Sequence, residues 1–269
     1  MRFWAAAVFV LLGAPVSAQV LDPARATGDG CELPAPPPYS KPVTAQNGPV
    51  VEARYAGATS DYAHGVLGDA IEGRTIMVRY DDGTHQFCDA IDAGPGRVFE
   101  DTSPRLADLN GDGLSEVIAV ASSATQGARL EIYGYPGPGK AFQLLAHTPY
   151  IGTRNRWLAP MGAADLDGDG VMEIAYIDRP HLAKTLRVWR YENQSLTEIA
   201  VQPGFSNHKI GWPFIAGGIR DCGPGPEMIL STGNWARLMA VQLKNGQLEA
   251  RDLGAYTGPD SLNSALNCS

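Results

Sequence analysis

The sequence predicts an all-β protein and, within that class, a small β-propeller of four to five blades. Three observations support this prediction. The chain of 269 residues contains 31 glycines and 20 prolines, yet 44% of its residues are hydrophobic, which is typical of a globular domain rich in turns. Two nearly identical acidic segments begin 57 positions apart, at Asp108 and Asp165, so a unit is repeated. Short stretches between them alternate polar and apolar residues, as half-buried strands do.

The first 18 residues fit an export signal. Arg2 supplies a positive charge, residues 3–12 form an uncharged apolar run, and residues 16–18 provide a small-residue cleavage site. The run is too short to span a bilayer, because a transmembrane helix needs about 20 apolar residues. We therefore expect an exported protein, periplasmic or secreted, without a membrane span.

The net charge argues against a nucleic-acid partner. The formal charge is −8, whereas proteins that bind nucleic acids or anionic membranes present a basic face. Residues 19–45 include the proline-rich segment 34–38 and are expected to form an extended arm. Residues 46–269 are expected to form a single propeller domain, and the protein is expected to be a monomer.

Four cysteines, at positions 31, 88, 222 and 268, are spaced too widely for a C-x-x-C redox or zinc pair. An oxidising compartment favours disulfides, so we expect two of them. Three pairings are possible. We favour Cys31–Cys88 with Cys222–Cys268, because the second bond would fix the C-terminal tail to the last repeat.

The strands of the repeated unit can be followed between the acidic segments. Residues 129–133, 186–191, 196–201 and 238–243 read as short strands, separated by turn signals such as Asn245-Gly246. Each unit offers about four strands, the content of a propeller blade. Outside the export signal no sustained helical periodicity is present, so no helix is predicted.

Two degenerate copies of the repeat are predicted at residues 64–69 and 217–230. A strand near residues 50–55 is expected to complete a blade with the C-terminal end and so close the ring. Aromatic residues also recur at a fixed place before each loop. They are expected to fill the core between units, with a ligand platform as the alternative; these residues are Tyr62, Phe99, Trp157 and Trp212.

The two acidic segments have the composition of calcium loops. Each places oxygen-bearing side chains at alternate positions of a glycine-rich turn, and hard oxygen ligands favour Ca²⁺ over softer metals. Flanking strands and the place of the last glutamate distinguish them from EF-hands. The predicted ligands, with Leu114 and Val171 acting through their carbonyls, are Asp108, Asn110, Asp112, Leu114 and Glu116 in one loop and Asp165, Asp167, Asp169, Val171 and Glu173 in the other.

These loops, each followed by an apolar strand, resemble the FG-GAP/VCBS repeats, which also form the calcium-bearing blades of integrin α-subunit propellers. The resemblance is specific over residues 99–120 and 157–178 and weaker over 55–90 and 205–245. It implies a β-propeller with Ca²⁺ in blade hairpin loops, hence two calcium sites. The degenerate copies lack the acids, so no metal is expected there. The chain is too short for the seven blades usual in the family.

Few features of the sequence indicate a chemical function other than calcium binding. The chain has no G-x-S-x-G, H-E-x-x-H or phosphate-binding loop, so no catalytic residue is predicted. Cationic residues in the linkers are candidates for a ligand-binding face that would suit an anionic small molecule, sugar acid or peptide carboxylate. These residues are Arg154, Arg156, Arg179, His181, His208 and Arg220.

Two classes of function remain open. In the first, the protein is a noncatalytic binding or scaffold module for a protein or a glycan. In the second, it is a hydrolase or lyase acting on an extracellular polysaccharide or sugar, with His181 and His208 as acid–base groups. The second requires these two histidines to lie in one pocket. The absence of a catalytic motif favours the first.

Overall fold

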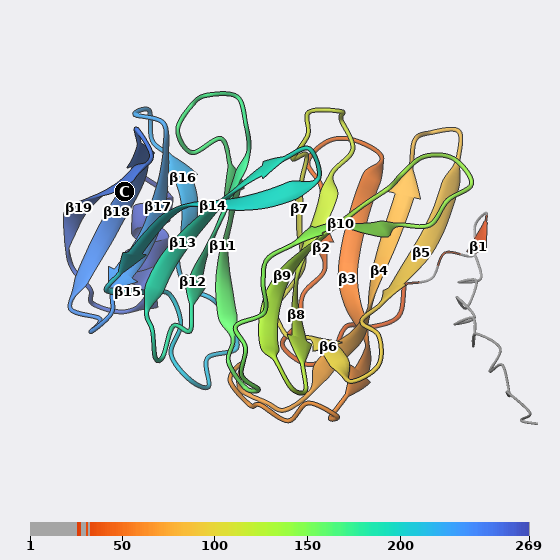
Figure 1. The fold of residues 1–269 in the computed structure, drawn as a ribbon, viewed down its shortest axis with the longest axis horizontal. Coiled ribbons are helices and arrows are strands. Elements are labelled where there is room, and N and C mark those ends of the chain that lie inside the picture. The colour runs from red at the N-terminus through yellow and green to blue at the C-terminus, as the bar shows by residue number, and fades with distance from the viewer. Residues whose placement is uncertain (1–25, 28–30, 32, 269) are drawn as a thin grey trace, which may run out of the picture.

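The computed structural model describes residues 26–27, 31 and 33–268, so the predicted export signal lies outside the described residues. The prediction of an all-β protein is confirmed, since strands β1 to β19 account for all regular structure in the described part except one short helix. The strands form four units that lie side by side in chain order, from orange at one end to blue at the other (Figure 1). None of the helices in the described residues is long and apolar enough to cross a membrane.

Each unit is an antiparallel sheet of strands that follow one another along the chain. Unit 1 contains β2 (Val43–Thr44), β3 (Val50–Thr59), β4 (Glu72–Asp81) and β5 (Gln86–Asp92). Unit 2 contains β7 (Arg105–Ala107), β8 (Glu116–Ser123), β9 (Gly127–Gly134) and β10 (Gln143–His147). Unit 3 contains β11 (Leu158–Ala164), β12 (Glu173–Asp178), β13 (Thr185–Glu192) and β14 (Ser195–Pro203). Unit 4 contains β16 (Gly218–Asp221), β17 (Pro226–Thr232), β18 (Arg237–Lys244) and β19 (Gln247–Ala255).

Three short strands add to these units. β1 (Ala26–Thr27) pairs with β5, and β15 (Phe205–Ser206) pairs with β17. β6 (Arg97–Phe99) pairs with both β4 and β8, which joins units 1 and 2 into one ten-stranded sheet. Neighbouring units are therefore linked through the segments that connect them.

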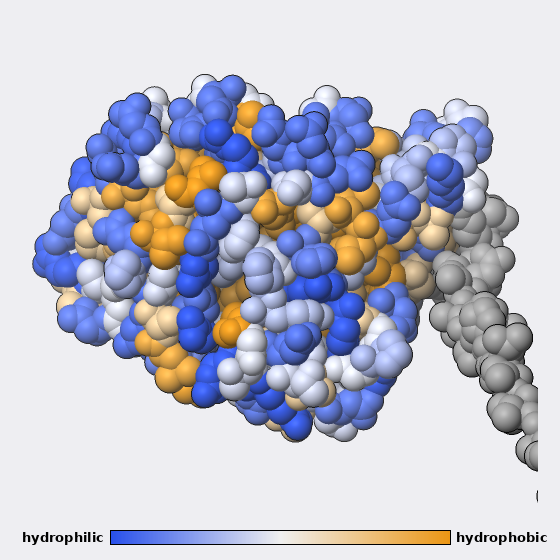
Figure 2. Space-filling model, viewed as in Figure 1, coloured by the Kyte–Doolittle hydropathy of each residue, from blue (hydrophilic) through white to orange (hydrophobic). Residues whose placement is uncertain are grey.

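The strands that follow the acidic loops are buried along their whole length. Every residue of β8 and of β12 is buried, and both strands are runs of apolar residues interrupted by few polar ones. Such runs are typical of strands covered on both faces. The outermost strands β14 and β19 are instead mostly exposed. Figure 2 accordingly shows hydrophobic residues reaching this face of the molecule only in separate patches between hydrophilic stretches.

Hydrophobic side chains fill the junctions between neighbouring units. Units 1 and 2 meet around Ile76, Phe99 and Val117, and units 2 and 3 meet around Ile118 and Leu158. Units 3 and 4 share a third cluster, which includes Ile177, Leu186, Met228 and Leu230. The aromatic residues predicted as core are buried in three cases, since Tyr62, Phe99 and Trp157 are each at most 2% exposed. Burial of both faces of each inner sheet explains why the units stack.

The expected ring closure is wrong. β3 pairs with β2 and β4 within unit 1 and not with the C-terminal end of the chain. Among the described residues, the strands of units 1 and 4 share neither a pairing nor a hydrophobic cluster, and Figure 1 shows them at opposite ends of the row. Their link is made by loops, where the backbone N–H of Gly211 donates to the carbonyl of Val66 over 2.9 Å.

The predicted degenerate copy at residues 64–69 is also misplaced. This segment lies in the connection between β3 and β4, where it lines the opposite end of the units from the acidic loops. The turn between β2 and β3 holds the place that the acidic loops hold in units 2 and 3, between the first and second strands. Gly48 in this turn lies so close to the carbonyl of Gly113 that a Cβ would be 2.5 Å from its oxygen.

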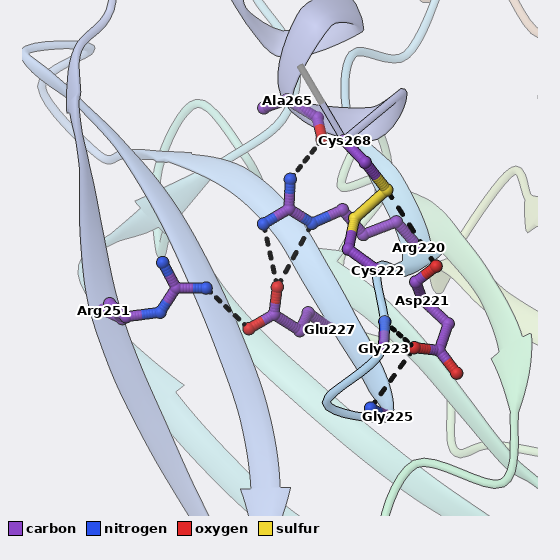
Figure 3. Close-up of a disulfide and its surroundings, with 9 residues drawn as sticks. All are labelled: Arg220, Asp221, Cys222, Gly223, Gly225, Glu227, Arg251, Ala265 and Cys268. Carbon is purple, nitrogen blue, oxygen red and sulfur yellow. Dashed lines mark hydrogen bonds and ion pairs between the residues drawn. A yellow bond between two sulfur atoms is a disulfide. The ribbon is translucent and has the colours of Figure 1, made fainter.

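A helix that the sequence did not predict closes unit 4. α1 (Pro259–Leu266) buries Leu262 and Ala265 against the outer face of β17, and both disulfides have the favoured pairing. Cys222–Cys268 joins the turn after β16 to the end of α1, as Figure 3 shows. The prediction that this bond fixes the C-terminal tail to the last repeat is therefore confirmed. The hydrophobic periodicity of the sequence does not indicate this helix, because the helix is short and buries only two residues.

Candidate functional site

The acidic loop of unit 3 folds around its own first residue. The two carboxylate oxygens of Asp165 accept hydrogen bonds from the backbone N–H groups of Gly168 (2.8 Å) and Gly170 (3.0 Å). Both glycines have positive φ, 78° and 89°, a conformation that costs glycine little. Glu173 closes the loop by accepting a hydrogen bond from the N–H of Leu166 over 2.8 Å. The loop is thus shaped by carboxylates that face inward.

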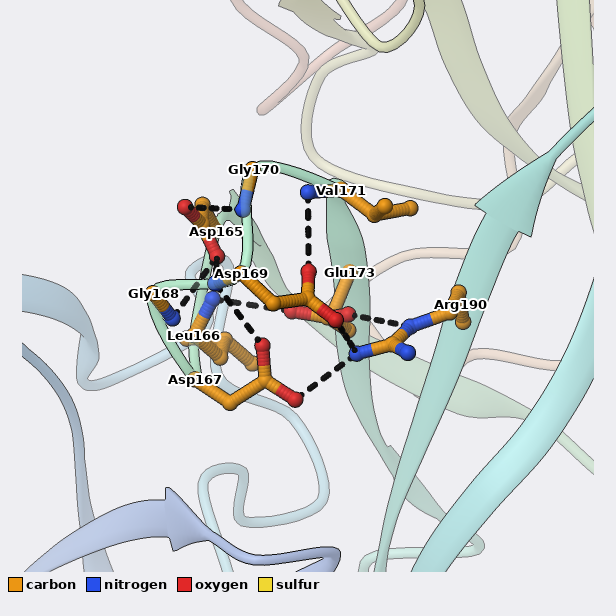
Figure 4. A network of polar contacts seen from close by, with 9 residues as sticks. All are labelled: Asp165, Leu166, Asp167, Gly168, Asp169, Gly170, Val171, Glu173 and Arg190. Atoms are coloured by element: carbon orange, nitrogen blue, oxygen red, sulfur yellow. Dashed lines mark hydrogen bonds and ion pairs between the residues drawn. The ribbon is translucent and has the colours of Figure 1, made fainter.

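Three carboxylates of this loop converge. Oxygens of Asp165, Asp167 and Glu173 lie within 4.8 Å of one another, a spacing that allows them to hold one metal ion. The guanidinium of Arg190, on β13, also contacts this cluster, with nitrogens 2.8 Å from Glu173 Oε1 and 2.7 Å from Asp167 Oδ2 (Figure 4). A third ion pair, of 2.9 Å, joins Arg190 to Asp169. An internal cation therefore balances part of the charge that a divalent ion would neutralise.

The loop of unit 2 has the same backbone arrangement without an arginine. Asp108 accepts from the N–H groups of Gly111 and Gly113, and Glu116 accepts from Leu109. Asn110 donates to Glu116 Oε1 over 3.0 Å. Where unit 3 places Arg190 opposite Glu173, unit 2 has Gly134, whose ideal Cβ would lie 3.6 Å from Glu116 Oε1. Burial raises the pKa of Glu116 to about 7.

The donor sets fit the predicted cation in character. The predicted side-chain ligands are carboxylates in both loops, with the amide of Asn110 added in unit 2, and such oxygen donors are the ones that Ca²⁺ prefers. Asp112 and Asp169 hold the turn by accepting backbone hydrogen bonds from Leu114 and Val171. The predicted roles of the carbonyls of these last two residues stay predictions.

Unit 4 retains the glutamate of the repeat but not its acidic partners. Glu227 is clamped by Arg220, with nitrogens at 2.8 and 3.1 Å, and by Arg251 at 2.8 Å (Figure 3). Burial opposes ionisation, but the hydrogen bonds from these arginines hold the pKa of Glu227 below its ordinary value. Arg220 also donates to the carbonyl of Ala265 in α1. Arg220, predicted for the ligand-binding face, thus has its charge paired with Glu227.

A pocket of about 270 Å³ opens at the opposite end of the units from the acidic loops. It is built by four connections that are distant in sequence: β3–β4, β10–β11, β12–β13 and β15–β16. Its lining residues are His64, Val66, Asn155, Arg156, Trp157, Arg179, Pro180, His181, Leu182 and Ile210. Clefts of roughly this size and mixed lining are where small ligands bind. Of the six residues predicted for a ligand-binding face, the pocket wall includes three.

One side of the pocket contains a histidine backed by a buried acid. His64 Nδ1 contacts Glu100 Oε1, and the hydroxyl of Ser122 donates to the other oxygen of Glu100. Glu100 is fully buried, and burial raises its pKa. The indole N–H of Trp157 donates to the Glu100 carbonyl over 2.7 Å. A buried carboxyl group in this position fixes the orientation of the imidazole. When the carboxyl group is ionised, it also makes the imidazole a stronger base.

The other side contains two coupled histidines. His208 Nε2 lies 2.9 Å from the carbonyl of Trp212, and a carbonyl can only accept, so this nitrogen carries the proton. Burial lowers the pKa of both His181 and His208 to about 4, so both rings are neutral at pH 7. His208 Nδ1 must then accept from His181 Nε2, 2.9 Å away. This chain of bonds leaves Nδ1 of His181 without a proton.

We expect both histidines to stay neutral from pH 8 down to about pH 5. Their ordinary pKa of about 6.5 would make them largely charged at pH 5, but burial disfavours the imidazolium form. Nitrogen-15 chemical shifts of the ring atoms across this pH range measure the charge directly. Protonation of His208 with a midpoint above pH 6 would contradict the assignment.

The arginines of the pocket differ in how their charge is used. Arg179 is held by Asp178 through two bonds of 2.8 and 3.0 Å, so its charge is largely neutralised. Arg156 donates to the Asn155 carbonyl and has no carboxylate partner among the described residues. Arg154 lies with its guanidinium 5.9 Å from the ring centre of Tyr62 and is likewise unpaired with an acid in this part of the chain. The pocket therefore offers Arg156 as an available cation.

Sequence reasoning missed His64, Glu100 and Trp157 as members of one site. His64 was assigned to a repeat copy, and no local pattern around Glu100 distinguishes it from a surface acid. Two features of the sequence indicate this end of the units: the recurring aromatic residue, which includes Trp157, and the cationic residues of the linkers. Asn155 has positive φ, 54°, and its N–H donates to the hydroxyl of Tyr62, which fixes the pocket edge to the β3–β4 connection.

Residues 108–176 match the family model for the FG-GAP-like repeat, a range that includes both acidic loops. No curated protein matches the chain significantly. Among solved structures, an exo-β-1,3-galactanase from Phanerochaete chrysosporium in complex with β-1,3-galactotriose is 12% identical, with a TM-score of 0.41. The match covers 78% of this chain and 50% of the galactanase, so the chain spans half the length of that enzyme.

A second similar structure is a β-xylosidase/α-arabinofuranosidase of family GH43 from a compost microbial metagenome, in complex with xylotriose. It is 14% identical with a TM-score of 0.39, over 78% of this chain and 81% of that one. Similarity at these TM-scores says nothing of the activity of this chain.

Proposed function

We propose that this chain, which carries an FG-GAP-like repeat at residues 108–176, is an exported propeller-type module that binds a carboxylated sugar unit of a glycan in its pocket. One observation carries the proposal: Arg156, an arginine without an acidic partner among the described residues, lines a pocket in which the other arginine, Arg179, is paired with Asp178. In a chain of net charge −8, a cation kept free at a pocket favours an anionic ligand. Arginine binds carboxylates through paired hydrogen bonds.

The remaining lining residues suit a sugar ring. Trp157, Val66 and Ile210 give the pocket an apolar side, against which the C–H groups of a sugar can pack. His181 offers a proton-free nitrogen, and the Asn155 side-chain oxygen is buried without a hydrogen-bond partner in the described structure. A sugar hydroxyl that donates to either group would satisfy an acceptor that is otherwise unpaired. No covalent chemistry is required for such binding.

The acidic loops serve stability in this proposal. We assign one Ca²⁺ to the loop of residues 165–173 and one to the loop of residues 108–116, the hard cation supplying positive charge to each carboxylate cluster. Both loops lie between the first and second strands of units 2 and 3. Bound cations would order the ends of these strands, while the pocket is formed by connections at the other end. We further propose that residues 46–269 form one monomeric propeller-type domain located in the periplasm or outside the cell.

The experiment that tests the pocket is a titration with glucuronate and glucose by isothermal calorimetry. Glucuronate is expected to bind and glucose to bind at least tenfold more weakly. Arg156→Ala should weaken glucuronate binding about tenfold or more, because a hydrogen bond to a charged group contributes about 1.5–3 kcal/mol. It should leave glucose binding unchanged.

Arg251→Ala is the matched control, since it removes an exposed arginine near the acidic-loop end of unit 4. Equal affinities for the two sugars, or an equal effect of both arginine substitutions, would overturn the proposal. Thermal unfolding of each variant separates a loss of binding from a loss of folding.

A sugar-acting enzyme is the second candidate, and one arrangement favours it. His64 is oriented by the buried Glu100 at the pocket, as a general base would be, and His181 and His208 lie together as this function requires. Product formation from acidic polysaccharides, followed by reducing-end and ultraviolet assays, tests it. Activity that is lost in His64→Ala, with glucuronate binding retained, would replace the binding-module assignment. Without turnover, the binding module stands.

A further inference from the structure

Three aromatic rings near the end of unit 4 surround a lysine. The ammonium of Lys209 lies 4.7 Å from the ring centre of Trp235, 5.2 Å from that of Tyr256 and 5.3 Å from that of Trp212. All three distances are within the range of cation–π attraction. Trp235 meets Trp212 at 70° and Tyr256 at 63°, so the rings form the walls of a concave site. We call these three rings the aromatic cage.

Lys209 is held in the cage by the rings alone. No carboxylate of the described residues lies within ion-pair distance of its ammonium, although the chain contains 29 acidic residues. The rings are only partly buried, as is Lys209 itself. The rings pack against the hydrophobic cluster of unit 4 but remain partly exposed, so the Lys209 side chain has a path from the cage to solvent.

The other walls of the cage are fixed. Trp212 stacks on Phe214 at 4.7 Å, and its carbonyl accepts from the pocket histidine His208. Tyr256 follows β19, and its hydroxyl is buried without a hydrogen-bond partner among the described residues. The stacked ring and the hydrogen-bonded carbonyl hold Trp212 in place as one wall of the cage.

We propose that the aromatic cage is a binding site for a quaternary ammonium group and that Lys209 occupies it in the absence of that ligand. A trimethylammonium group is larger than the lysine ammonium and more weakly hydrated, so three aromatic faces attract it more strongly. The ligand displaces the Lys209 side chain into solvent. This site is separate from the sugar pocket of the proposed function and does not depend on it.

The segment that contains Lys209 also reaches the pocket. The next residue, Ile210, is 72% exposed and lines the pocket wall. The loop that carries both residues is held to Val66 through Gly211. Adjacent residues of one segment therefore line the cage and the pocket.

The test is a titration with tetramethylammonium chloride, followed by tryptophan fluorescence and by NMR line broadening of the methyl signal. Lys209→Ala empties the cage and is expected to bind the cation at least tenfold more tightly than the wild type. Lys209→Ala/Trp235→Ala should lose this gain. Lys244→Ala, which removes an exposed lysine paired with Glu249, is the matched control and should behave as the wild type. Sodium chloride at equal ionic strength corrects for screening.

A quaternary ammonium group can come from a lipid headgroup or from a free cation. Phosphatidylcholine vesicles and free choline distinguish these two sources. Binding of Lys209→Ala to phosphatidylcholine vesicles above phosphatidylglycerol vesicles assigns a lipid headgroup, and binding to choline without vesicle association assigns a free cation. Equal cation binding by the wild type and Lys209→Ala, or retention of the gain when Trp235 is removed, would overturn the proposal. Circular dichroism confirms that each variant is folded.

Discussion

Glu72→Gln is expected to stabilise the protein by roughly 3–5 kcal/mol at pH 8 and by little near pH 4.5. Glu72 is 4% exposed, and burial raises its pKa to about 9, with further contributions from the charges of Glu100, Asp69 and Asp101. The folded protein thus retains a proton that the unfolded chain releases above about pH 4.5. Stability is lost as the pH rises from 4.5 towards 9, and glutamine, which is neutral throughout, removes that loss.

Urea denaturation of both proteins at pH 5 and pH 8 measures the effect. Glu249→Gln is the matched control, because Glu249 is exposed on β19 and should show no change in the pH dependence. The same slope of unfolding free energy against pH in the wild type and Glu72→Gln would contradict a buried neutral acid at this position. Glu72 lies outside the pocket wall, so glucuronate binding should be retained.

Calcium is expected to raise the melting temperature, and a chelator to lower it, by several degrees. A ligand present at about 100 times its dissociation constant stabilises the native state by roughly 2.7 kcal/mol. Asp167→Ala should abolish the calcium response of the unit 3 loop, and Asn110→Ala should weaken that of the unit 2 loop. Differential scanning calorimetry with and without calcium measures each response.

Arg190 provides a second test of the calcium site in unit 3. Its guanidinium contacts the same carboxylates that would bind the ion, so Arg190→Gln is expected to increase calcium affinity, opposite in sign to Asp167→Ala. Asp221→Ala is the control, since unit 4 has no converging acids and Asp221 contacts only backbone N–H groups of its own turn. A chelator without effect on any of these proteins would count against both calcium sites.

The sequence predicted the strands and acidic loops well because their determinants are local. The converging carboxylates of Asp165, Asp167 and Glu173 follow from a fixed spacing on one glycine-rich turn. The apolar runs after each loop became the fully buried strands β8 and β12. Local patterns of this kind contain the physical cause of the structure they predict.

The pocket could not be predicted, because four distant connections build it. His64 meets Glu100 across 36 residues, and His181 meets His208 across 27. Only the packing of the units sets these distances. The ion pair of Arg220 likewise depends on strand pairing. Arg220 lies opposite Glu227 across the β16–β17 hairpin, so its charge is paired there.

The two ends of the row are finished in different ways. At one end β1 adds to β5 and Cys31 is bonded to Cys88; at the other, α1 and Cys222–Cys268 cover β17. A terminal unit of a stack has a strand-bearing neighbour on one side alone, so it frays first unless it is capped. Here a disulfide crosslinks each terminal unit, which adds stability where a stack of units is weakest. Reducing agents should therefore open the molecule from its extremities, and the buried strands β8 and β12 should retain protection from hydrogen exchange longest.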